Sequence, residues 1–339
     1  MRVLLLIVGL AAGVAFVLLA AAEGGRAFWY QAWLVAVLFW LGTALGGLML
    51  LLTQQIAMGG WGPDAAAPVA ALTGTLPLPL LAFVPLGFAL SALLPGLSPG
   101  PDVAGLAAER APWISMPGLL ARTGVIFVLW LVLASAGIWG RLPRPAAVLG
   151  LLLGSVSLVL FYVDWVLGLT PGWSAAIFPF AIAVALGLSG PTVLVLRGSA
   201  GTHGLGPWLC GGALFLLYLL FVQYLVIWSG NLPDQVTWYL ARQGAPWPDI
   251  AITGFCLLGT AAVSGLVWPR LLAGAAARLV ALALLLGEIL VAVWMILPAF
   301  APLTPLAYGL TALALVSLGG LWGLLYLSLD GLRSAREGV

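Results

Sequence analysis

Three ionisable residues interrupt long apolar stretches of the chain: Arg122, Asp164 and Glu288. If those stretches cross a membrane, each charge deep in lipid costs at least about 2.5 to 3.5 kcal/mol on insertion scales. Residues kept at that cost normally face the protein interior and mark a functional path for protons, ions or substrates. They are therefore the first candidates for chemistry in this sequence.

Arg122 and Asp164 are predicted partners. Arg122 lies near the start of the apolar stretch 118–139, and Asp164 lies near the end of the stretch 146–167. At about 1.5 Å per residue, both side chains sit roughly one helical turn below the same membrane surface. Two interpretations stay open: a structural ion pair that locks two helices together, or an Asp164 carboxyl that exchanges protons at the mouth of a pathway.

Glu288 lies near the middle of the stretch LVALALLLGEILVAVWMIL, with no arginine at its depth. We expect its carboxyl group to be neutral much of the time, because desolvation disfavours the charged form. Hydroxyl groups of Tyr218, Thr260, Ser264 or Thr311 are the expected hydrogen-bond partners. Glu288 is then either a protonated packing residue satisfied by one hydroxyl group or a carboxyl that relays protons or binds a ligand. The candidate proton path consists of Asp164, Glu288, Arg122, Tyr218, Ser264 and Thr260.

The composition places these residues in a membrane protein. Of 339 residues, 63% are hydrophobic and only 6% are charged, and the mean hydropathy is +1.19. A water-soluble protein carries roughly 25% charged residues, and a membrane-spanning helix needs about 20 mainly apolar residues. The sequence therefore predicts an all-α integral membrane protein. Ten stretches are long enough to span, at residues 3–22, 29–52, 68–94, 118–139, 146–167, 173–196, 207–228, 249–269, 276–297 and 303–327.

Two of these stretches need comment. The third contains Pro77, Pro79 and Pro85, so we expect it to begin late or to kink, because proline removes a backbone donor and clashes with the preceding turn. The first, within residues 1–22, has the basic start and alanine-rich end of a secretory signal. Its apolar run of about 20 residues exceeds the 7 to 15 of a signal. We predict that it is the first helix, with a cleaved signal as the alternative.

Glycine and tryptophan positions carry packing information. Gly42 and Gly46 lie four residues apart in the second stretch, and such spacing permits close contact between membrane helices. The sixteen tryptophans cluster towards the ends of the stretches, as in the aromatic belt at membrane interfaces. Neither pattern is assigned any chemistry.

The arginines predict the orientation. Ten spans place the N-terminus, every second connection and the C-terminus on one side of the membrane. Eight arginines then share that side and four lie on the other, which by the positive-inside rule puts both termini in the cytoplasm. The host membrane is predicted to be the bacterial inner membrane. The first group is Arg2, Arg141, Arg144, Arg197, Arg270, Arg278, Arg333 and Arg336, and the second is Arg26, Arg110, Arg122 and Arg242.

Redox cofactors held by this chain alone are not expected. The single histidine, His203, lies in a predicted connection, which excludes a bis-histidine haem within the bilayer, and there is no C-x-x-C-H motif for covalent haem. Cys210 and Cys256 stand alone, without a histidine, cysteine or carboxylate at ligand spacing, so no metal site is predicted. No phosphate-binding glycine loop with a lysine is present. Any redox reaction must use cofactors of partner subunits or a diffusible one.

The connection at 229–248 has more detail than a linker requires. Its sequence runs WSGNLPDQVTWYLARQG from Trp228. Asn231 and Pro233 are expected to end the preceding helix, while Trp238 and Tyr239 are expected to anchor the connection at headgroup depth. We predict that this connection lies on the exterior face and packs against protein. The residues assigned to the exterior loop and its partner contacts are Trp228, Ser229, Asn231, Asp234, Trp238 and Tyr239.

Four segments together resemble a known family. They are this loop, FYVDWVLGLTPGWSAAIFPF at 161–180, LFWLGTALGGLML at 38–50 and MGGWG at 58–62. The strings IWSGNLP and DW-x-x-x-L-x-P-x-W resemble the F subunit of bacterial alternative complex III, a member of the polysulfide-reductase membrane-subunit (NrfD-like) class. The aspartate of the family's DW string corresponds to Asp164, and its exterior loop to Ser229–Asp234.

The resemblance implies two four-helix bundles, at 29–167 and 173–297, flanked by the first and last spans within one membrane domain, 1–339. It also implies a place in a quinol-oxidising complex, beside an iron–sulfur subunit, a multihaem cytochrome c subunit and a homologous ten-span subunit. Haem c and iron–sulfur clusters then belong to those partners. On this resemblance the chain itself binds no redox cofactor, although binding of quinol stays possible. Its other expected contacts are membrane lipids, and no nucleic-acid partner is expected.

The chain departs from that pattern by its near absence of histidine, the usual proton acceptor of a quinol site. A scaffolding or proton-conducting role in the complex is therefore expected rather than catalysis. Two alternatives stay open: a secondary transporter or channel acting alone, and a membrane anchor for another quinone-linked reductase.

Overall fold

The computed structural model describes residues 1–22, 28–57, 62–97, 113, 115–140, 142–198, 202–231, 233–272, 274–300 and 303–337. All regular structure in these residues is helical, and ten segments are long and apolar enough to cross a membrane. The predicted all-α, multi-pass membrane class is confirmed. Arg26, Arg110, Arg141 and most of the MGGWG string lie outside the described residues. The division into two bundles at 29–167 and 173–297 stays a prediction.

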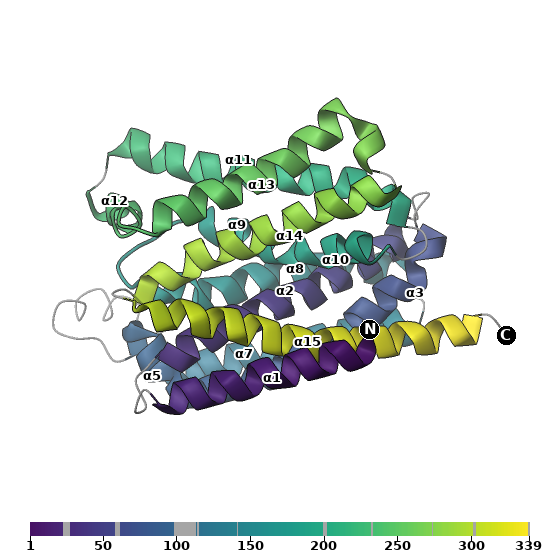
Figure 1. Ribbon diagram of the computed structural model, residues 1–339, viewed down its shortest axis with the longest axis horizontal. Coiled ribbons are helices and arrows are strands. Elements are labelled where there is room, and N and C mark those ends of the chain that lie inside the picture. Colours follow the sequence, from purple (N-terminus) through teal and green to yellow (C-terminus); the bar gives the residue numbers. More distant parts are fainter. Residues whose placement is uncertain are drawn as a thin grey trace.

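Eight of the ten candidate spans are built on one long helix each, and their bounds lie within a few residues of the predicted windows, except that α15 continues to Glu337, ten residues beyond the predicted end at 327. The helices run side by side in alternating directions (Figure 1). They are α1 (Arg2–Ala22), α2 (Phe28–Ile56), α7 (Met116–Trp139), α8 (Arg144–Trp165), α11 (Gly206–Gly230), α13 (Trp247–Val267), α14 (Gly274–Ile296) and α15 (Pro305–Glu337).

The third span is broken, as its prolines predict. Proline at positions 77, 79 and 85 removes backbone donors. The span therefore consists of short α-helical and 3-10 segments instead of one helix. The segments are α3 (Gly62–Thr73), α4 (Pro77–Ala82), η1 (Val84–Ala89), α5 (Leu90–Leu93) and η2 (Pro95–Leu97).

The sixth span, predicted as one stretch at 173–196, crosses as one segment but has a gap in its helical hydrogen bonds. It consists of α9 (Phe178–Gly187) and α10 (Ser189–Arg197), and Leu188 between them keeps helical dihedral angles, with φ at −65° and ψ at −24°. Pro191 has no N–H to donate to the carbonyl group four residues earlier, that of Gly187, so the helical ladder is interrupted at this point. The interruption lies deep inside the bundle, where Ser189 is fully buried.

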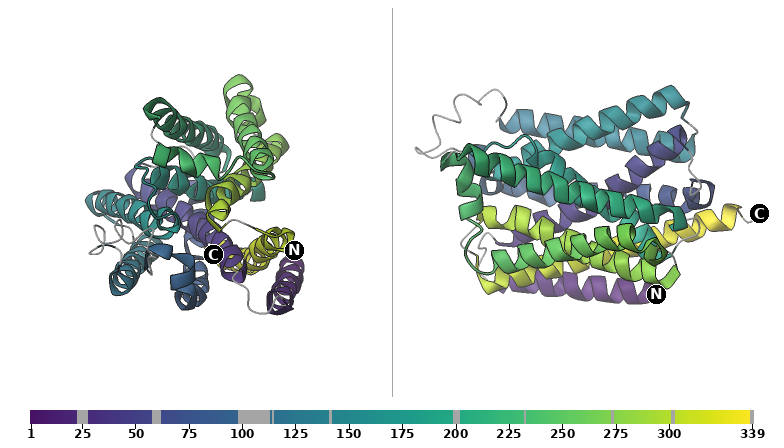
Figure 2. Two further views of the ribbon diagram at one scale, coloured as in Figure 1. Left: turned by 90° about the vertical axis from the view of Figure 1, so that its left-hand side faces the viewer. Right: turned by 90° about the horizontal axis from the view of Figure 1, so that it is seen from above.

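Helix α2 runs through the interior of the bundle, and 89% of its most apolar window is buried (Figure 2). Its glycines meet the broken sixth span at backbone distance. A Cβ atom on Gly46 would overlap the carbonyl oxygen of Gly187, and one on Gly190 would lie 2.8 Å from the carbonyl oxygen of Thr43. The predicted close contact at Gly42 and Gly46 is confirmed, because a Cβ atom on Gly42 would likewise overlap Leu186.

Helix α1 packs along α15, and both chain termini lie at the same end of the bundle (Figure 1). The Arg2 Nη2 atom donates to the Leu327 carbonyl oxygen at 2.8 Å. We call the end that carries Arg2 and the start of α8 the terminal end, and the opposite end, with the connection between α11 and α13, the far end. That residues 1–22 are retained as the first helix, and not cleaved as a signal, stays a prediction.

The contact between α1 and α15 is testable through one glycine. A Cβ atom on Gly320 would lie 2.6 Å from the Cα atom of Gly9 and 2.8 Å from the Leu5 carbonyl oxygen. We expect Gly320→Leu to lower the free energy of unfolding by about 1–3 kcal/mol through overpacking. Gly309→Leu on the same helix is the control, because an added Cβ there meets nothing within 4 Å. Thermal unfolding in detergent, followed by tryptophan fluorescence, measures both; equal midpoints would contradict the contact.

Candidate functional site

The ion pair predicted between Arg122 and Asp164 is confirmed near the far end of α7 and α8. The Arg122 Nε and Nη2 atoms donate to the two carboxylate oxygens of Asp164, each at 2.9 Å. Trp113 adds a third donor, its Nε1 atom lying 3.0 Å from Asp164 Oδ1, and the guanidinium carbon of Arg122 lies 4.1 Å from the centre of the Trp113 ring. The pair joins two neighbouring helices.

This geometry bears on the two interpretations of Asp164. Both carboxylate oxygens already accept hydrogen bonds, and the Asp164 side chain is 4% exposed. Proton uptake would remove the negative charge that pairs with the Arg122 guanidinium. A second clamp lies beside the pair, where the Trp165 Nε1 atom donates to the Thr123 hydroxyl at 3.0 Å. The contacts favour a structural ion pair, and the proton-exchange role of Asp164 stays a prediction.

Glu288 is fully buried on α14, and its contact comes from the break in the sixth span. The Thr192 hydroxyl lies 3.0 Å from Glu288 Oε1, and Glu288 Oε2 has no hydrogen-bond partner among the described residues. The same Thr192 hydroxyl lies 2.8 Å from the Leu188 carbonyl oxygen. A hydroxyl carries one hydrogen. If that hydrogen goes to Leu188, Glu288 must be the donor, so a protonated carboxyl satisfies both contacts.

Two further buried hydroxyls lie at the same break. The Thr43 and Ser189 side-chain oxygens are 2.7 Å apart, and each also contacts a carbonyl oxygen of its own helix, that of Phe39 at 2.9 Å and that of Leu186 at 2.6 Å. Two hydroxyl hydrogens serve three contacts, so the cluster has more acceptors than hydrogens. We call the set Thr43, Ser189, Thr192 and Glu288 the midplane cluster. It joins α2, α10 and α14.

The hydroxyls that the sequence suggested as partners of Glu288 are elsewhere, and that prediction is wrong. Tyr218 is 59% exposed on the outer face of α11. Thr260, Ser264 and Thr311 donate to carbonyl groups of their own helices, at Cys256, Thr260 and Ala307 respectively. Thr192 was missed, although the run Ser-Gly-Pro-Thr at 189–192, with polar residues around a helix breaker in an apolar stretch, could have identified it. Whether Tyr218, Thr260 or Ser264 conducts protons stays untested.

The connection between α11 and α13 packs against protein, as predicted. It contains the short helix α12 (Pro233–Leu240), on which Trp238 is 4% exposed. The Trp238 ring stacks on Trp173, with ring centres 4.9 Å apart, and the Trp173 Nε1 atom donates to the Gln235 carbonyl oxygen at 3.1 Å. The anchoring role of Trp238 is confirmed, and Tyr239 is partly buried beside it.

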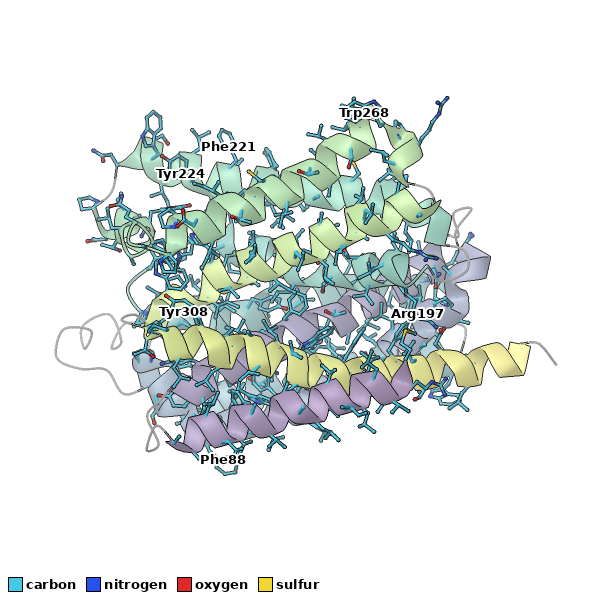
Figure 3. All side chains as sticks on the ribbon, viewed as in Figure 1. Phe88, Arg197, Phe221, Tyr224, Trp268 and Tyr308 are labelled. Atoms are coloured by element: carbon cyan, nitrogen blue, oxygen red, sulfur yellow. The ribbon has the colours of Figure 1, made fainter. Side chains whose placement is uncertain are left out.

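The start of this connection faces outwards. Asn231 ends α11 in the left-handed conformation, with φ at 45°, and its backbone N–H donates to the Ile227 carbonyl oxygen. Trp228, Ser229 and Asp234 are exposed, and Leu232 lies outside the described residues. Outward-facing aromatic side chains continue along α11, where Phe221 and Tyr224 point away from the bundle (Figure 3). The prediction that these residues contact a partner protein stays untested.

Arg242 is a buried arginine with several hydrogen bonds whose role was not predicted from the sequence. It was counted only as an exterior charge, yet it is 5% exposed and donates to three carbonyl oxygens. Two of these belong to Trp294 and Met295 in the last turn of α14, at 3.0 Å each, and the third to Trp238 at 2.7 Å. Its guanidinium carbon also lies 3.4 Å from the Trp238 ring centre.

The charge of Arg242 is stabilised by carbonyl dipoles and by an aromatic ring. Neither salt bridge found among the described residues includes Arg242. The last carbonyl groups of a helix carry partial negative charge, and an aromatic face adds cation–π attraction. Burial lowers the pKa of Arg242 to about 9, which leaves the guanidinium charged at neutral pH. The residue therefore joins α12 to the far end of α14.

The described residues contain no group of three or more histidine, cysteine, aspartate or glutamate side chains that could hold a metal ion. Cys210 is buried against the Ala262 carbonyl oxygen, and Cys256 is exposed. No protein-family model matches the chain, and no curated protein matches it significantly. The fold and site define a class: a polytopic α-helical membrane protein with a buried carboxyl at a broken helix.

The role of Arg242 predicts a stability change. We expect Arg242→Gln to lower the free energy of unfolding by about 2–3 kcal/mol, because a hydrogen bond to a charged group contributes about 1.5–3 kcal/mol and buried carbonyl groups lose their donors. Arg242→Lys should fall between, since an ammonium group keeps the charge but not the planar fork. Arg270→Gln, at an exposed position of the terminal end, is the control. Thermal unfolding and proteolysis of α12 report the effect; unchanged proteolysis in Arg242→Gln would contradict the anchor.

Proposed function

We propose that this multi-pass membrane protein is a subunit of a quinol-oxidising respiratory complex, of the kind found as the F subunit of alternative complex III. In this proposal it lies in the bacterial inner membrane with both termini in the cytoplasm. It supports the complex and conducts protons, while iron–sulfur clusters and haem c in partner subunits carry the electrons. The IWSGNLP and DW-x-x-x-L-x-P-x-W strings support the assignment of the complex.

The single observation that carries the proton-conducting role is the state of Glu288. It is a fully buried carboxyl with one oxygen on the Thr192 hydroxyl and the other without a partner among the described residues. Both salt bridges found in the described part of the chain lie elsewhere, so no cation compensates a charge on Glu288. A carboxyl without a counter-ion, beside hydroxyls that both donate and accept, is suited to taking up and releasing a proton.

The position of Glu288 fits a relay across the membrane. The Arg278 guanidinium lies against Gly198 at the terminal end, and Glu288 follows Arg278 by ten residues on α14, or about 15 Å. That is about half of the roughly 30 Å hydrocarbon core. Protons would enter from the terminal end, reach the midplane cluster and leave at the far end, where Asp164 is the proposed exit group. The apolar interior between the two carboxyls must then admit water during transfer.

The break between α9 and α10 favours a second candidate, a secondary transporter. Transporters commonly place their substrate and ion sites near the midplane, at interrupted helices whose termini face the site. Here Ser189 and Thr192 lie beside the missing helical hydrogen bond at Pro191, in a backbone that stays helical, and face α2 and α14. An anchor for another quinone-linked reductase would share the fold and differ in its partner subunits.

Glu288→Gln tests the proton-conducting role. It keeps the shape and hydrogen bonding of the side chain but removes the titratable proton. In vesicles that contain the purified complex, we expect proton release coupled to quinol oxidation to fall by about 10²-fold, the lower limit usual for losing a positioned acid or base. Thr311→Val, which removes a buried hydroxyl bonded only within its own helix, is the control. Wild-type proton release from an assembled Glu288→Gln complex would make Glu288 a packing residue.

The identity of the complex is tested separately. Purification under mild conditions, followed by haem staining and subunit identification, should recover an iron–sulfur subunit, a multihaem cytochrome c and a second ten-span subunit. Recovery of the chain alone, together with solute uptake by vesicles that contain it, would instead support the transporter.

A further inference from the structure

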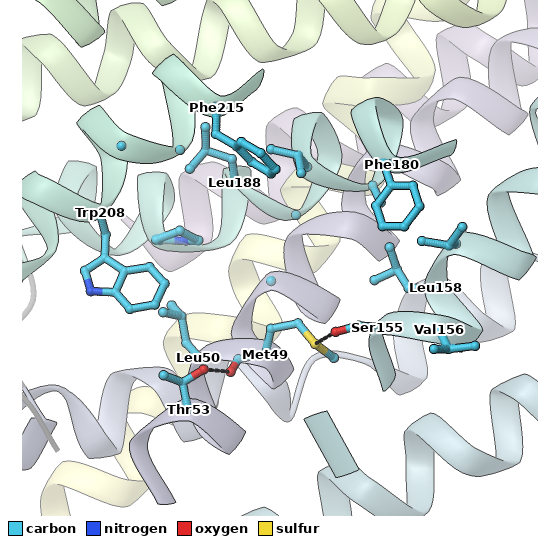
Figure 4. A pocket seen from close by; sticks show the side chains of 18 of the residues that line it. Met49, Leu50, Thr53, Ser155, Val156, Leu158, Phe180, Leu188, Trp208 and Phe215 are labelled. Atoms are coloured by element: carbon cyan, nitrogen blue, oxygen red, sulfur yellow. Dashed lines mark hydrogen bonds between the residues drawn. The ribbon is translucent and has the colours of Figure 1, made fainter. Parts of the chain in front are cut away.

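A lateral groove on the membrane-facing surface is independent of the proposed proton path. It lies between α8 and α11, with α2, α9 and α10 as its floor, and has a volume of about 950 Å³. Figure 4 shows Trp208 and Phe215 on one wall and Leu158 and Val156 on the other, with Met49 below them. The volume is at the upper end of the roughly 300 to 1,000 Å³ typical of ligand pockets.

The lining limits the occupant to a hydrocarbon. None of the described residues that line the groove carries a charge, and its hydroxyl groups belong to Thr53 and Ser155. Both are already engaged with Met49: Thr53 donates to its carbonyl oxygen at 2.7 Å, and Ser155 contacts its sulfur at 4.0 Å. A polar ligand would lose its hydration here without compensation. An apolar chain would meet apolar walls.

Glycines create the space. A Cβ atom added to Gly187 on α9 or to Gly211 on α11 would meet nothing within 4 Å, and both residues line the groove. Most interior glycines behave differently, since a Cβ on Gly46 or Gly212 would overlap a neighbouring helix. Helix packing therefore does not require glycine at 187 or 211. The absence of side chains at these two positions leaves space in the groove beside α11.

The groove is long enough for an acyl chain and opens at the terminal end; along α9 and α10 its lining runs from Phe180 to Pro191, about 16 Å. Along α11 it extends from Pro207 to Phe215, which is about 12 Å, and half of the roughly 30 Å hydrocarbon core is about 15 Å. It begins in the first turn of α11, at the terminal end, where Trp208 is 45% exposed. Tryptophan at that depth is typical of the headgroup boundary.

The charges at the terminal end favour an anionic headgroup. The exposed arginines of the described residues gather at that end, with Arg197 paired to Asp330 at 3.4 Å, whereas at the far end Arg122 is paired with Asp164 and Arg242 is buried. Basic side chains at a membrane surface attract anionic lipids. The exposed set is Arg2, Arg144, Arg197, Arg270 and Arg278.

We propose that the groove binds one acyl chain of an anionic glycerophospholipid from the leaflet at the terminal end. The chain follows α11 from Trp208 towards Phe215 over Gly211 and Gly187. Its phosphate lies at the surface among the arginines. The proposal does not depend on the quinol complex or on Glu288.

Gly211→Leu tests the site, because Gly211 lines the groove and an added Cβ atom there meets nothing within 4 Å. The control is Gly259→Leu on α13, where an added Cβ also meets nothing within 4 Å and which lies outside the groove. The probe is phosphatidylglycerol, titrated into purified, delipidated protein and counted by native mass spectrometry. We expect one tightly retained lipid in the wild type and in Gly259→Leu, and at least about tenfold weaker retention in Gly211→Leu, a change equivalent to about 1.4 kcal/mol.

Two further arms distinguish other occupants. Equal retention of phosphatidylcholine would overturn the anionic headgroup, and displacement of phosphatidylglycerol by a long-chain quinone in the wild type, but not in Gly211→Leu, would identify an isoprenoid site instead. If Gly211→Leu does not fold, phosphatidylglycerol with a photoreactive group on its acyl chain is applied to the wild type. Labelling of the peptides that contain Trp208 and Phe215 supports the proposal, and labelling confined to other helices overturns it.

Discussion

The rest of the structure depends on one contact, in which α2 and the broken sixth span meet backbone to backbone. No Cβ atom fits at Gly42, Gly46 or Gly190 without overlapping or crowding the opposite chain. Lipid provides no hydrophobic drive between helices, so association relies on van der Waals packing and on small residues that let backbones approach. This approach brings the Thr43 and Ser189 hydroxyls to 2.7 Å and so gives the polar groups at the break a partner from α2.

The same break has two faces with different chemistry. On the interior face, Thr192 reaches Glu288 and collects polar groups in a place where each must find a partner within the protein. On the membrane face, Gly187, Leu188 and Pro191 form part of the apolar groove. One helix thus separates a buried carboxyl from an apolar membrane-facing groove.

The sequence predicted depth well and helix rotation poorly. Hydropathy and rise per residue give the position of a side chain along the membrane normal, which is why the ion pair of Arg122 and Asp164 could be predicted from matched depth. They give no information about which way a side chain faces, since both lipid and the protein core are apolar and an amphipathic pattern is nearly absent. Thr260 and Tyr218 could therefore not be excluded as partners of Glu288 from their depth alone.

Local backbone effects were a second limit on what could be predicted from the sequence. The prolines of the third span predicted its breaks because three of them lie close together, whereas Pro191, in the middle of the sixth stretch, was overlooked. Arg242 was missed for a different reason. Its acceptors are carbonyl groups at the end of α14, and main-chain acceptors leave no trace in the residue types of a sequence.

The distance along the chain between Arg242 and those acceptors has a consequence for biosynthesis. Trp294 and Met295 follow Arg242 by 52 and 53 residues, which at about 5–20 residues per second takes about 3–10 s of translation. During that interval the guanidinium has neither carbonyl group available and the α12 segment cannot take its final place. The far end of the second half of the molecule is thus completed only when the ninth span has been inserted. Chains that stop before residue 294 would leave the Arg242 guanidinium with the Trp238 carbonyl and ring but without two of its three carbonyl acceptors.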